Sequence, residues 1–323
     1  MPRHTLQETV RAIRDHKEFA LAAHVNPEGD CVASLLALDS LLGKVGKKSH
    51  IFCEDPIPTG LSFLDNGRWK HSKTNLPAVS FDAAAVVDCG SMERIGKAQE
   101  LLTAKKTFLI NIDHHISNRD FGDINFVDVK AAASGELIYD LFRAFQVPLS
   151  KEDRELIYVS LSTDTGSFRY SNTTAKTHEI AGRLLAEGLD TETLNERLYD
   201  SMPLERFRLF KVFLDRIRFE DGGRIAYALV TDEDLKLAQA GKEHLEGFVE
   251  FMRSLRGVEI SFLVTLDGEN SRLSFRSKGS CDVNVIASNF GGGGHRKAAG
   301  CTIHAQPEEA VGKVLAYVRN SAH

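Results

Sequence analysis

Asp113-His114-His115 is the densest group of chemically competent side chains in this sequence, and it directly follows an apolar run, Thr107 to Ile112. Imidazole and carboxylate groups together bind divalent ions such as Mn²⁺, Fe²⁺, Co²⁺ and Mg²⁺. Two such ions about 3.5–4 Å apart can direct the hydrolysis of a phosphate ester. Three further apolar runs lead to a side chain of the same kind: Phe19 to Ala23 before His24, Ala83 to Val87 before Asp88, and Leu156 to Leu161 before Asp164.

The segment His24-Val25-Asn26-Pro27-Glu28-Gly29-Asp30 places an imidazole and two carboxylates within seven residues. Pro27 and Gly29 favour a turn, so one loop can present all three groups together. The donor set has no group of thiolates, which argues against a structural zinc site and leaves Mn²⁺, Fe²⁺, Co²⁺ and Mg²⁺ open. Cys31 and Cys89 lie beside proposed ligands, and we interpret both as small buried residues.

Two of these residues have further predicted roles. Two cations stay close together only if they share an anionic ligand, and Asp88, which follows a central strand, is the candidate. His115 is the candidate for stabilising charge on the phosphoryl oxygens in the transition state. Taken alone, Asp88 could cap a helix and His24 could be a core histidine. Four successive strand ends that carry Asp or His for unrelated reasons are a weaker explanation than one metal site.

These side chains need a scaffold that brings distant segments together. Short β-rich apolar runs are typical of buried strands, and the segments between them have helical spacing. Alternating strands and helices predict a mainly parallel sheet flanked by helices, with the carboxyl ends of the strands at one ligand-binding edge. We therefore expect residues 1–188 to form an α/β catalytic domain. Its expected helices include Ser34 to Leu42, Arg94 to Leu102 and Glu136 to Phe145.

Length and composition predict a soluble protein of two domains. The 323 residues exceed one typical domain, and 42% hydrophobic and 26% charged residues are ordinary for a globular protein. No apolar stretch approaches the roughly 20 residues that span a bilayer. Scattered cysteines and a start without an apolar signal segment indicate a cytoplasmic protein. A net charge of −5 and a pI near 6.2 argue against binding of long nucleic acid.

The pattern changes in the second half of the chain. Residues 189–222 are charged and helix-like, with an interruption at Met202-Pro203, and we interpret them as a helical linker. Residues 223–323 predict a smaller α/β domain with a mixed sheet, and a cleft between the two domains. Its expected elements are strands at Arg224 to Thr231 and Ala299 to His304, a hairpin of Glu259 to Leu266 with Arg272 to Arg276, and helices at Leu245 to Leu255, Val283 to Phe290 and Glu308 to Arg319.

The run Gly291-Gly292-Gly293-Gly294-His295-Arg296-Lys297 is the second strong feature. Four glycines allow close approach of the backbone to a ligand and can aim several N–H groups at one anion. The adjacent cations and Arg276 favour a phosphate, and Arg272 is either part of this site or a surface residue. The spacing fits neither the P-loop nor the dinucleotide-binding pattern. A flexible linker is the alternative, but helix and strand flank the run.

At these residues the chain resembles the DHH family of phosphoesterases, named after the triplet seen here as Asp113-His114-His115. His24 to Asp30 resembles the family's first motif, Val87-Asp88-Cys89-Gly90-Ser91 its second, and Ser162-Thr163-Asp164-Thr165-Gly166 its fourth. The glycine run with His295 resembles the signature of the family's associated C-terminal domain. The combination is most similar to the NrnA-type branch, oligoribonucleases that act on very short RNA and often remove the 3′-phosphate of pAp.

The resemblance implies a metal-dependent phosphoesterase with two Mn²⁺ ions, for which Mg²⁺ or Co²⁺ could substitute. His115 would contact the scissile phosphate, and Asp113 would orient the neighbouring histidines. The implied ligands are His24, Glu28 and Asp88 for one ion, and Asp30, Asp88, His114 and Asp164 for the other. The implied substrate-binding residues of the C-terminal domain are Arg276, Gly292, Gly293, Gly294, His295 and Arg296.

The implied reaction is the cleavage of dinucleotides and other very short single-stranded RNA (nanoRNA) to 5′-mononucleotides. Related substrates are pAp and the linear products of cyclic dinucleotides. Long nucleic acid and membranes are not expected partners. A homodimer is compatible with the sequence, although no residue specifies one.

Two positions depart from the family's pattern: Glu28 stands where the family usually has Asp, and Ala33 where it usually has Gly. The additional methylene of Glu28 shifts or weakens the first metal ion unless the loop relaxes, so a nucleotide-binding sensor with impaired catalysis is the alternative function. An inorganic pyrophosphatase of the same superfamily is disfavoured by the glycine run. A long single-strand exonuclease is disfavoured by the acidic pI.

Overall fold

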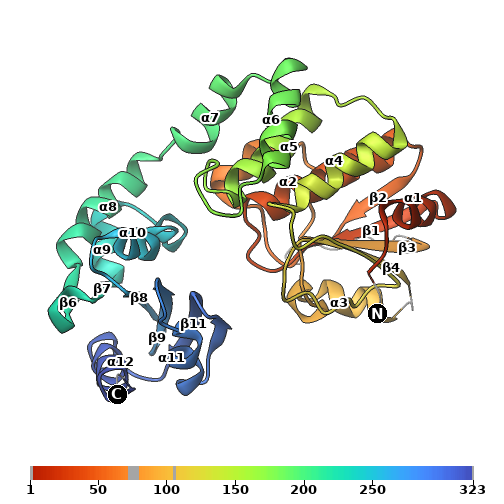
Figure 1. The fold of residues 1–323 in the computed structure, drawn as a ribbon. Coiled ribbons are helices and arrows are strands. Elements are labelled where there is room, and N and C mark those ends of the chain that lie inside the picture. The colour runs from red at the N-terminus through yellow and green to blue at the C-terminus, as the bar shows by residue number, and fades with distance from the viewer. Residues whose placement is uncertain (1–2, 72–79, 105–106, 322–323) are drawn as a thin grey trace. The chain divides into compact units, whose positions relative to one another are not determined.

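The computed structural model describes residues 3–71, 80–104 and 107–321. The chain divides into two compact units, Met1–Ser201 and Met202–His323 (Figure 1). The division falls between helix α7 (Thr191–Tyr199) and helix α8 (Leu204–Arg216). In the described ranges, no helix is both long and apolar enough to cross a membrane.

Five parallel strands form the sheet of the N-terminal unit, in the order β2-β1-β3-β4-β5. The chain places β2 on one side of β1 and β3 on the other, so strand addition reverses direction at β1. Ligands of such sheets bind at the carboxyl ends of the strands beside this reversal. The strands are β1 (Glu18–Ala22), β2 (Lys48–Ile51), β3 (Ala83–Val87), β4 (Phe108–Asp113) and β5 (Ile124–Val127).

Helices cover both faces of this sheet because its central strands are apolar almost throughout, and successive side chains of a strand point to opposite faces. Phe19 and Leu21 of β1 belong to the core that includes α2, α4 and α5, whereas Ala20 and Ala22 pack with α3. Figure 1 shows α2, α4 and α5 together on one side of the sheet and α3 on the other. The helical segments are α1 (Leu6–Asp15), α2 (Gly29–Lys44), η1 (Thr59–Leu64), η2 (Met92–Ile95), α3 (Ala98–Ala104), α4 (Ser134–Phe145), α5 (Lys151–Asp164) and α6 (Ala175–Ala186).

The prediction of a strand at Leu156 to Leu161 is wrong, because this segment lies within helix α5. A capping box begins the helix: the Ser150 side chain accepts a hydrogen bond from the N–H of Asp153, and the Asp153 carboxylate accepts one from the N–H of Ser150. The run is buried between α2 and α4, so it is apolar on all sides and lacks the helical period. Asp164 is therefore the last residue of a helix.

Two of the three helix predictions for this unit are confirmed with shifted bounds. The predicted helices near Ser34 and Glu136 are α2 and α4. The segment predicted as one helix from Arg94 to Leu102 is divided into η2 and α3 at Gly96, whose φ of 59° interrupts the helix. The short strands β2 and β5 were not predicted.

A mixed sheet of six strands forms the C-terminal unit, in the order β10-β11-β9-β8-β7-β6, with only β7 and β8 parallel. Phe213 and Phe248 lie in the core under α8, α9 and α10, and Phe262 and Phe275 lie in the core under α11 and α12. Strands β8 and β9 are the predicted hairpin. The remaining elements are β6 (Arg218–Glu220), η3 (Asp221–Gly223), β7 (Ile225–Val230), α9 (Asp232–Ala238), η4 (Lys242–Leu245), α10 (Phe248–Ser254), β8 (Ile260–Asp267), β9 (Asn270–Ser277), α11 (Val283–Asn289), β10 (Gly293–His295), β11 (Ala298–Ile303) and α12 (Pro307–Ser321).

Candidate active site

All six predicted metal ligands meet at the carboxyl edge of the N-terminal sheet. They come from the ends of β1, β3 and β4, the start of α2 and the end of α5. In the described part of the chain, three groups of side chains have ligand atoms within 4.8 Å of one another: His24, Glu28, Cys31 and Asp88; Asp88, His114 and His115; and Asp30, His114 and Asp164.

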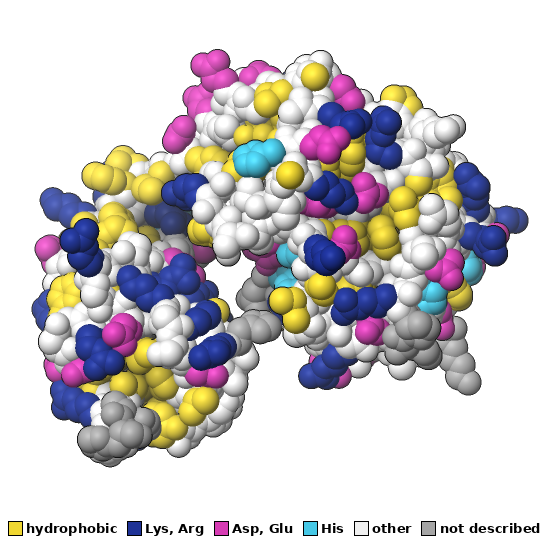
Figure 2. Space-filling model, in the orientation of Figure 1, with side chains coloured by type: hydrophobic (Ala, Val, Ile, Leu, Met, Phe, Trp, Pro, Cys, Tyr) yellow, Lys and Arg dark blue, Asp and Glu magenta, His cyan; other side chains and the backbone are white. Residues whose placement is uncertain are grey.

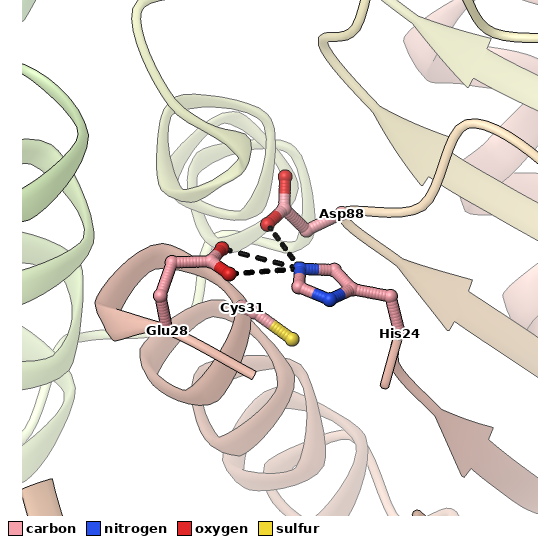
Figure 3. A group of neighbouring side chains, drawn as sticks. All are labelled: His24, Glu28, Cys31 and Asp88. Carbon is pink, nitrogen blue, oxygen red and sulfur yellow. Dashed lines mark hydrogen bonds and ion pairs between the residues drawn. The ribbon is translucent and has the colours of Figure 1, made fainter. Parts of the chain in front are cut away.

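His24 has one ring nitrogen fixed by the backbone and the other directed at carboxylates. Its Nδ1 donates to the carbonyl of Val25 at 2.8 Å. Its Nε2 lies 3.0 Å from Glu28 Oε2 and 3.6 Å from Asp88 Oδ2 (Figure 3). A ligating histidine commonly donates its second N–H to a carbonyl in this way. The longer Glu28 side chain therefore still reaches the space in front of Nε2.

His114 has the same organisation. Its Nδ1 lies 3.2 Å from the carbonyl of Ala131. Its Nε2 lies 3.4 Å from Asp88 Oδ1, 3.6 Å from Asp30 Oδ2 and 3.7 Å from Asp164 Oδ2. One imidazole nitrogen thus faces three carboxylates, an arrangement that a divalent cation would stabilise.

Asp88 lies between the two histidines. Its Oδ2 faces His24 and its Oδ1 faces His114, which is the geometry expected of a carboxylate shared by two ions. Ser134 Oγ donates to Oδ1 at 2.9 Å. The backbone of Asp88 has a φ of 55°, a left-handed conformation uncommon for residues other than glycine. Its N–H donates to the carbonyl of Ile112 at 2.9 Å, which holds this turn against β4.

Asp30 is fully buried and accepts four hydrogen bonds. Ser34 Oγ and Ser160 Oγ donate to its Oδ1 at 2.7 and 2.6 Å. The N–H of Ser134 donates to Oδ2 at 2.7 Å, and the N–H of Gly135 donates to Oδ1 at 3.3 Å. A carboxylate with this many donors is held in one orientation.

His115 is oriented by a chain of buried hydrogen bonds rather than by the backbone. Its Nδ1 donates to Asp113 Oδ1 at 2.7 Å. Asp113 is fully buried, and its Oδ2 accepts from the side-chain amide of Asn118, which also donates to Asn111 Oδ1 at 2.7 Å. Asp113 therefore fixes the tautomer of His115 with the proton on Nδ1 and leaves Nε2 as the atom that can face a substrate.

The titration behaviour of the cluster indicates an excess of acidic groups in the metal-free protein. Burial, reinforced by repulsion from Asp88, raises the pKa of Asp30 to about 8, and burial raises the pKa of Asp164 to about 6. Burial alone would lower the pKa of His114, but its hydrogen bond to Asp88 and the negative charges of Asp30, Asp88 and Asp164 together outweigh burial and raise the pKa to about 10. Protons therefore balance charge where cations would otherwise do so.

The spacing of the donor atoms fits divalent cations. Two ligand atoms that lie about 2.1 Å from one ion, at right angles to each other, are about 3 Å apart. The separations around His24 Nε2 and His114 Nε2 range from 3.0 to 3.7 Å. The mixture of imidazole and carboxylate groups suits Mn²⁺, Fe²⁺, Co²⁺ or Mg²⁺.

In the C-terminal unit, Gly292 and Gly293 line a cavity of about 510 Å³ together with Arg272. Arg276 and Arg296 are not among the residues that line it. Arg276 Nε pairs with Glu250 Oε1 at 2.7 Å, and Arg296 Nη2 donates to a backbone carbonyl at 2.9 Å. The side chain of His295 lies outside the described part of the structure.

The glycine run has a structural role beside any ligand. The N–H groups of Gly291 and Gly292 donate to carbonyls at the end of α11, and Gly293 begins strand β10. A Cβ on Gly292 would lie 2.2 Å from the carbonyl oxygen of Gly300, and Gly294 has a φ of 148°. Fewer amide groups are therefore available to an anion than the sequence suggested.

Several polar residues that support the site were not identified from the sequence. Asn172 Nδ2 donates to Asp164 Oδ2 at 3.3 Å, and Asn118, Ser134 and Ser160 hold the other carboxylates. Ser134 and Ser160 are polar residues within buried apolar segments, whereas Asn118 and Asn172 lie in polar loops, where the sequence carries no such signal.

Two protein-family models match this chain. Residues 18–161 match the DHH family, N-terminal domain, and residues 223–322 match the DHHA1 domain. The bifunctional oligoribonuclease and PAP phosphatase NrnA of Thermus thermophilus is 30% identical over 93% of this chain and 88% of its own length. The NrnA protein of Bacillus subtilis is 28% identical over 93% of this chain and 94% of its own.

The solved structure of an exopolyphosphatase-related protein from Bacteroides fragilis is 26% identical to this chain, with a TM-score of 0.90. It is matched over 97% of this chain and 94% of its own. Together the fold, the histidine and carboxylate cluster and these relatives define a metal-dependent hydrolase of phosphoester bonds. The chain belongs to the DHH family of phosphoesterases, and its C-terminal half carries the DHHA1 domain.

Proposed function

We propose that this protein is a two-metal phosphodiesterase that cleaves dinucleotides and nanoRNA to 5′-mononucleotides and also removes the 3′-phosphate of pAp. The proposal rests on the position of Asp88. One of its carboxylate oxygens lies 3.6 Å from His24 Nε2, and the other lies 3.4 Å from His114 Nε2. One carboxylate can thereby be shared by two ions, for which we propose Mn²⁺.

When bound, the two ions would lower the pKa of a water molecule and withdraw charge from the phosphate oxygens. His24, Glu28 and Asp88 would hold one ion, and Asp30, Asp88, His114 and Asp164 the other. His115 would donate from Nε2 to a phosphoryl oxygen of the scissile phosphate when its ring is protonated. Asp113 favours that cationic form, because its carboxylate accepts from Nδ1 at 2.7 Å.

The alternative function is a sensor that binds nucleotides without turnover. It requires that Glu28 prevents or weakens metal binding at the first position. Glu28 Oε2 lies 3.0 Å from His24 Nε2, so the longer side chain reaches the place where a ligand is needed. This contact supports catalysis over the sensor.

The names of the relatives and the C-terminal cavity support a short substrate. Two relatives that match over nearly the whole chain are named as oligoribonuclease and PAP phosphatase. We propose that the cavity lined by Gly292, Gly293 and Arg272 binds a phosphate of the substrate and that Arg276, His295 and Arg296 contribute to this binding. On the face drawn in Figure 2, Lys and Arg side chains are interspersed with Asp and Glu, which does not favour long nucleic acid.

The test is a cleavage assay with Mn²⁺ and four substrates: a 5′-labelled diribonucleotide, a 24-mer RNA, pAp and pyrophosphate. The variant is Asp88→Asn, and the matched control is Asp140→Asn, which removes a carboxylate of α4 that pairs with Lys176 of α6. We expect rapid cleavage of the diribonucleotide and slower release of phosphate from pAp. Asp88→Asn should lose both activities by a factor of at least about 10³, since a shared ligand serves both ions.

Pyrophosphate hydrolysis without diribonucleotide cleavage would replace the proposal with a pyrophosphatase. Tight diribonucleotide binding without turnover of any substrate would favour the sensor.

A further inference from the structure

Cys31, which we interpreted from the sequence as a small buried residue, lies at the candidate site. The side chain is fully buried on the first turn of α2. Its sulfur and the ligand atoms of His24, Glu28 and Asp88 all lie within 4.8 Å of one another. Figure 3 shows the thiol beside the His24 ring, together with the Glu28 and Asp88 carboxylates.

Helix geometry explains how α2 can serve both metal positions. Successive helical residues point about 100° apart. Asp30 accordingly belongs to the group with His114 and Asp164, whereas Cys31 belongs to the group around His24. The turn is fixed against α5, because a Cβ on Gly29 would lie 2.4 Å from the Thr163 side chain.

The position around His24 has fewer protein ligands than its neighbour if Cys31 is left out. His24, Glu28 and Asp88 offer three donors, whereas Asp30, Asp88, His114 and Asp164 offer four. With Cys31, the position around His24 also has four donors. A metal–sulfur bond is about 2.3 Å long, and a metal–nitrogen or metal–oxygen bond is about 2.1 Å long. The sulfur and another donor atom of the same ion are therefore at most about 4.4 Å apart. The 4.8 Å grouping admits such separations.

We propose that the sulfur of Cys31 is a fourth protein ligand of the ion held by His24, Glu28 and Asp88, and that it raises the affinity of this position for softer divalent ions relative to Mn²⁺. The inference rests on the proposed metal site. Binding forms a sulfur–metal bond and releases the thiol proton to solvent, with no change in oxidation state. Thiolate ligands favour Fe²⁺, Co²⁺ and Zn²⁺ over the harder Mg²⁺ and Mn²⁺. The second position, which has only nitrogen and oxygen donors, lacks this added preference.

Cys89 provides the matched control. It is also buried and also adjoins a proposed ligand, Asp88. Its thiol donates to the carbonyl of Ser91 at 3.1 Å, and it belongs to none of the metal-binding groups found in the described ranges.

The experiment is a Co²⁺ titration of the metal-free full-length protein, followed by absorption spectroscopy and equilibrium dialysis. Visible ligand-field bands report bound Co²⁺, and a near-ultraviolet sulfur-to-cobalt charge-transfer band reports a sulfur ligand. We expect the charge-transfer band in the wild type and in Cys89→Ala, and its loss in Cys31→Ala and Cys31→Ser. The affinity ratio of Co²⁺ to Mn²⁺ at the first position should fall by about tenfold or more in both Cys31 variants, the factor that 1.4 kcal/mol represents.

Bound Co²⁺ without a charge-transfer band in the wild type would overturn the role of Cys31 and leave the metal site intact. Persistence of the band in Cys31→Ser would do the same, since another sulfur would then be the ligand. Absence of any bound Co²⁺, together with no Mn²⁺-dependent cleavage, would overturn both this inference and the proposed function. Cys31→Ser retains a small polar side chain, so the test does not depend on Cys31→Ala folding normally.

Discussion

The hydrogen-bond chain from Asn118 through Asp113 to His115 gives the sharpest test of how the site works. Replacing Asn118 with Ala removes the amide that donates to Asp113 Oδ2 and to Asn111 Oδ1. Asp113 is fully buried, so no solvent is at hand to replace the lost donor. The Asp113 carboxylate then loses one of the contacts that aim its other oxygen at His115 Nδ1.

The magnitude follows from these contacts. A hydrogen bond to a charged group contributes about 1.5–3 kcal/mol, so we expect Asn118→Ala to lower the free energy of unfolding by about 2 kcal/mol. For a unit of this size the corresponding fall in Tm is about 4–8 °C. We expect kcat for the diribonucleotide to fall by about tenfold to a hundredfold, the range typical of residues that orient side chains at metal sites. KM should change little, because the amide is engaged with Asp113 and Asn111 within the protein.

The assay is a double-mutant cycle of Asn118→Ala with His115→Ala, measured under conditions where all variants are folded. If Asn118 acts through His115, its replacement should cost less than about threefold in kcat once His115 is absent. Asn66→Ala is the control, because Asn66 Nδ2 also donates to a carboxylate, Glu152 Oε1 at 3.1 Å, but on the surface. That variant should change stability by no more than about 0.5 kcal/mol.

Multiplicative losses in the cycle would refute the reasoning, since they would mean that Asn118 and His115 contribute independently. An unchanged kcat in the single variant would refute it as well.

Three further predictions concern packing, pH and metal binding. A Cβ on Gly135 would lie 2.1 Å from Ser160 Oγ, so Gly135→Ala should weaken metal binding and lower Tm, whereas Gly182→Ala, with open space around it, should leave metal binding unchanged in calorimetry. Burial alone would raise the pKa of Asp153, but the hydrogen bonds from Lys44, Ser40 and Ser150 together hold it below its ordinary value. The stabilisation is therefore present above about pH 4 and is lost as pH falls through the lower folded-state pKa. The Tm difference between wild type and Asp153→Asn should therefore be constant above about pH 5 and shrink in more acidic buffer, and a difference that grows there would contradict this account. Free Mn²⁺ at about a hundred times its Kd should stabilise the folded protein by about 2.7 kcal/mol in thermal unfolding, and no shift would argue against a metal site in the folded state.

The sequence predicted the part of the site that a parallel sheet assembles. Strands β1, β3 and β4 are short, apolar and followed by His24, Asp88 and Asp113, and parallel pairing brings their ends to one edge. The ligands could therefore be grouped without knowing any distance. The edge strands β2 and β5 were missed because each has only four residues and is partly exposed, so neither forms a clear apolar run.

The error at α5 has a physical cause. Leu156 to Leu161 is buried on every side, and a fully buried helix has no polar face to reveal its period. The capping box of Ser150 and Asp153 was the usable signal. Roles that depend on contacts across the fold, such as those of Asn118 and Cys31, have no local pattern in the sequence, because their partners are set by tertiary packing.

The four donors to Asp30 also bear on how the protein would handle metal exchange. Ser34, Ser134, Gly135 and Ser160 come from three helices that are already packed together in the folded unit. The carboxylate is thus preorganised, and an arriving ion need not order it at the expense of conformational entropy. Ions could then leave and rebind without local refolding, so the metal content of this enzyme would follow the supply of ions in its surroundings rather than the history of its folding.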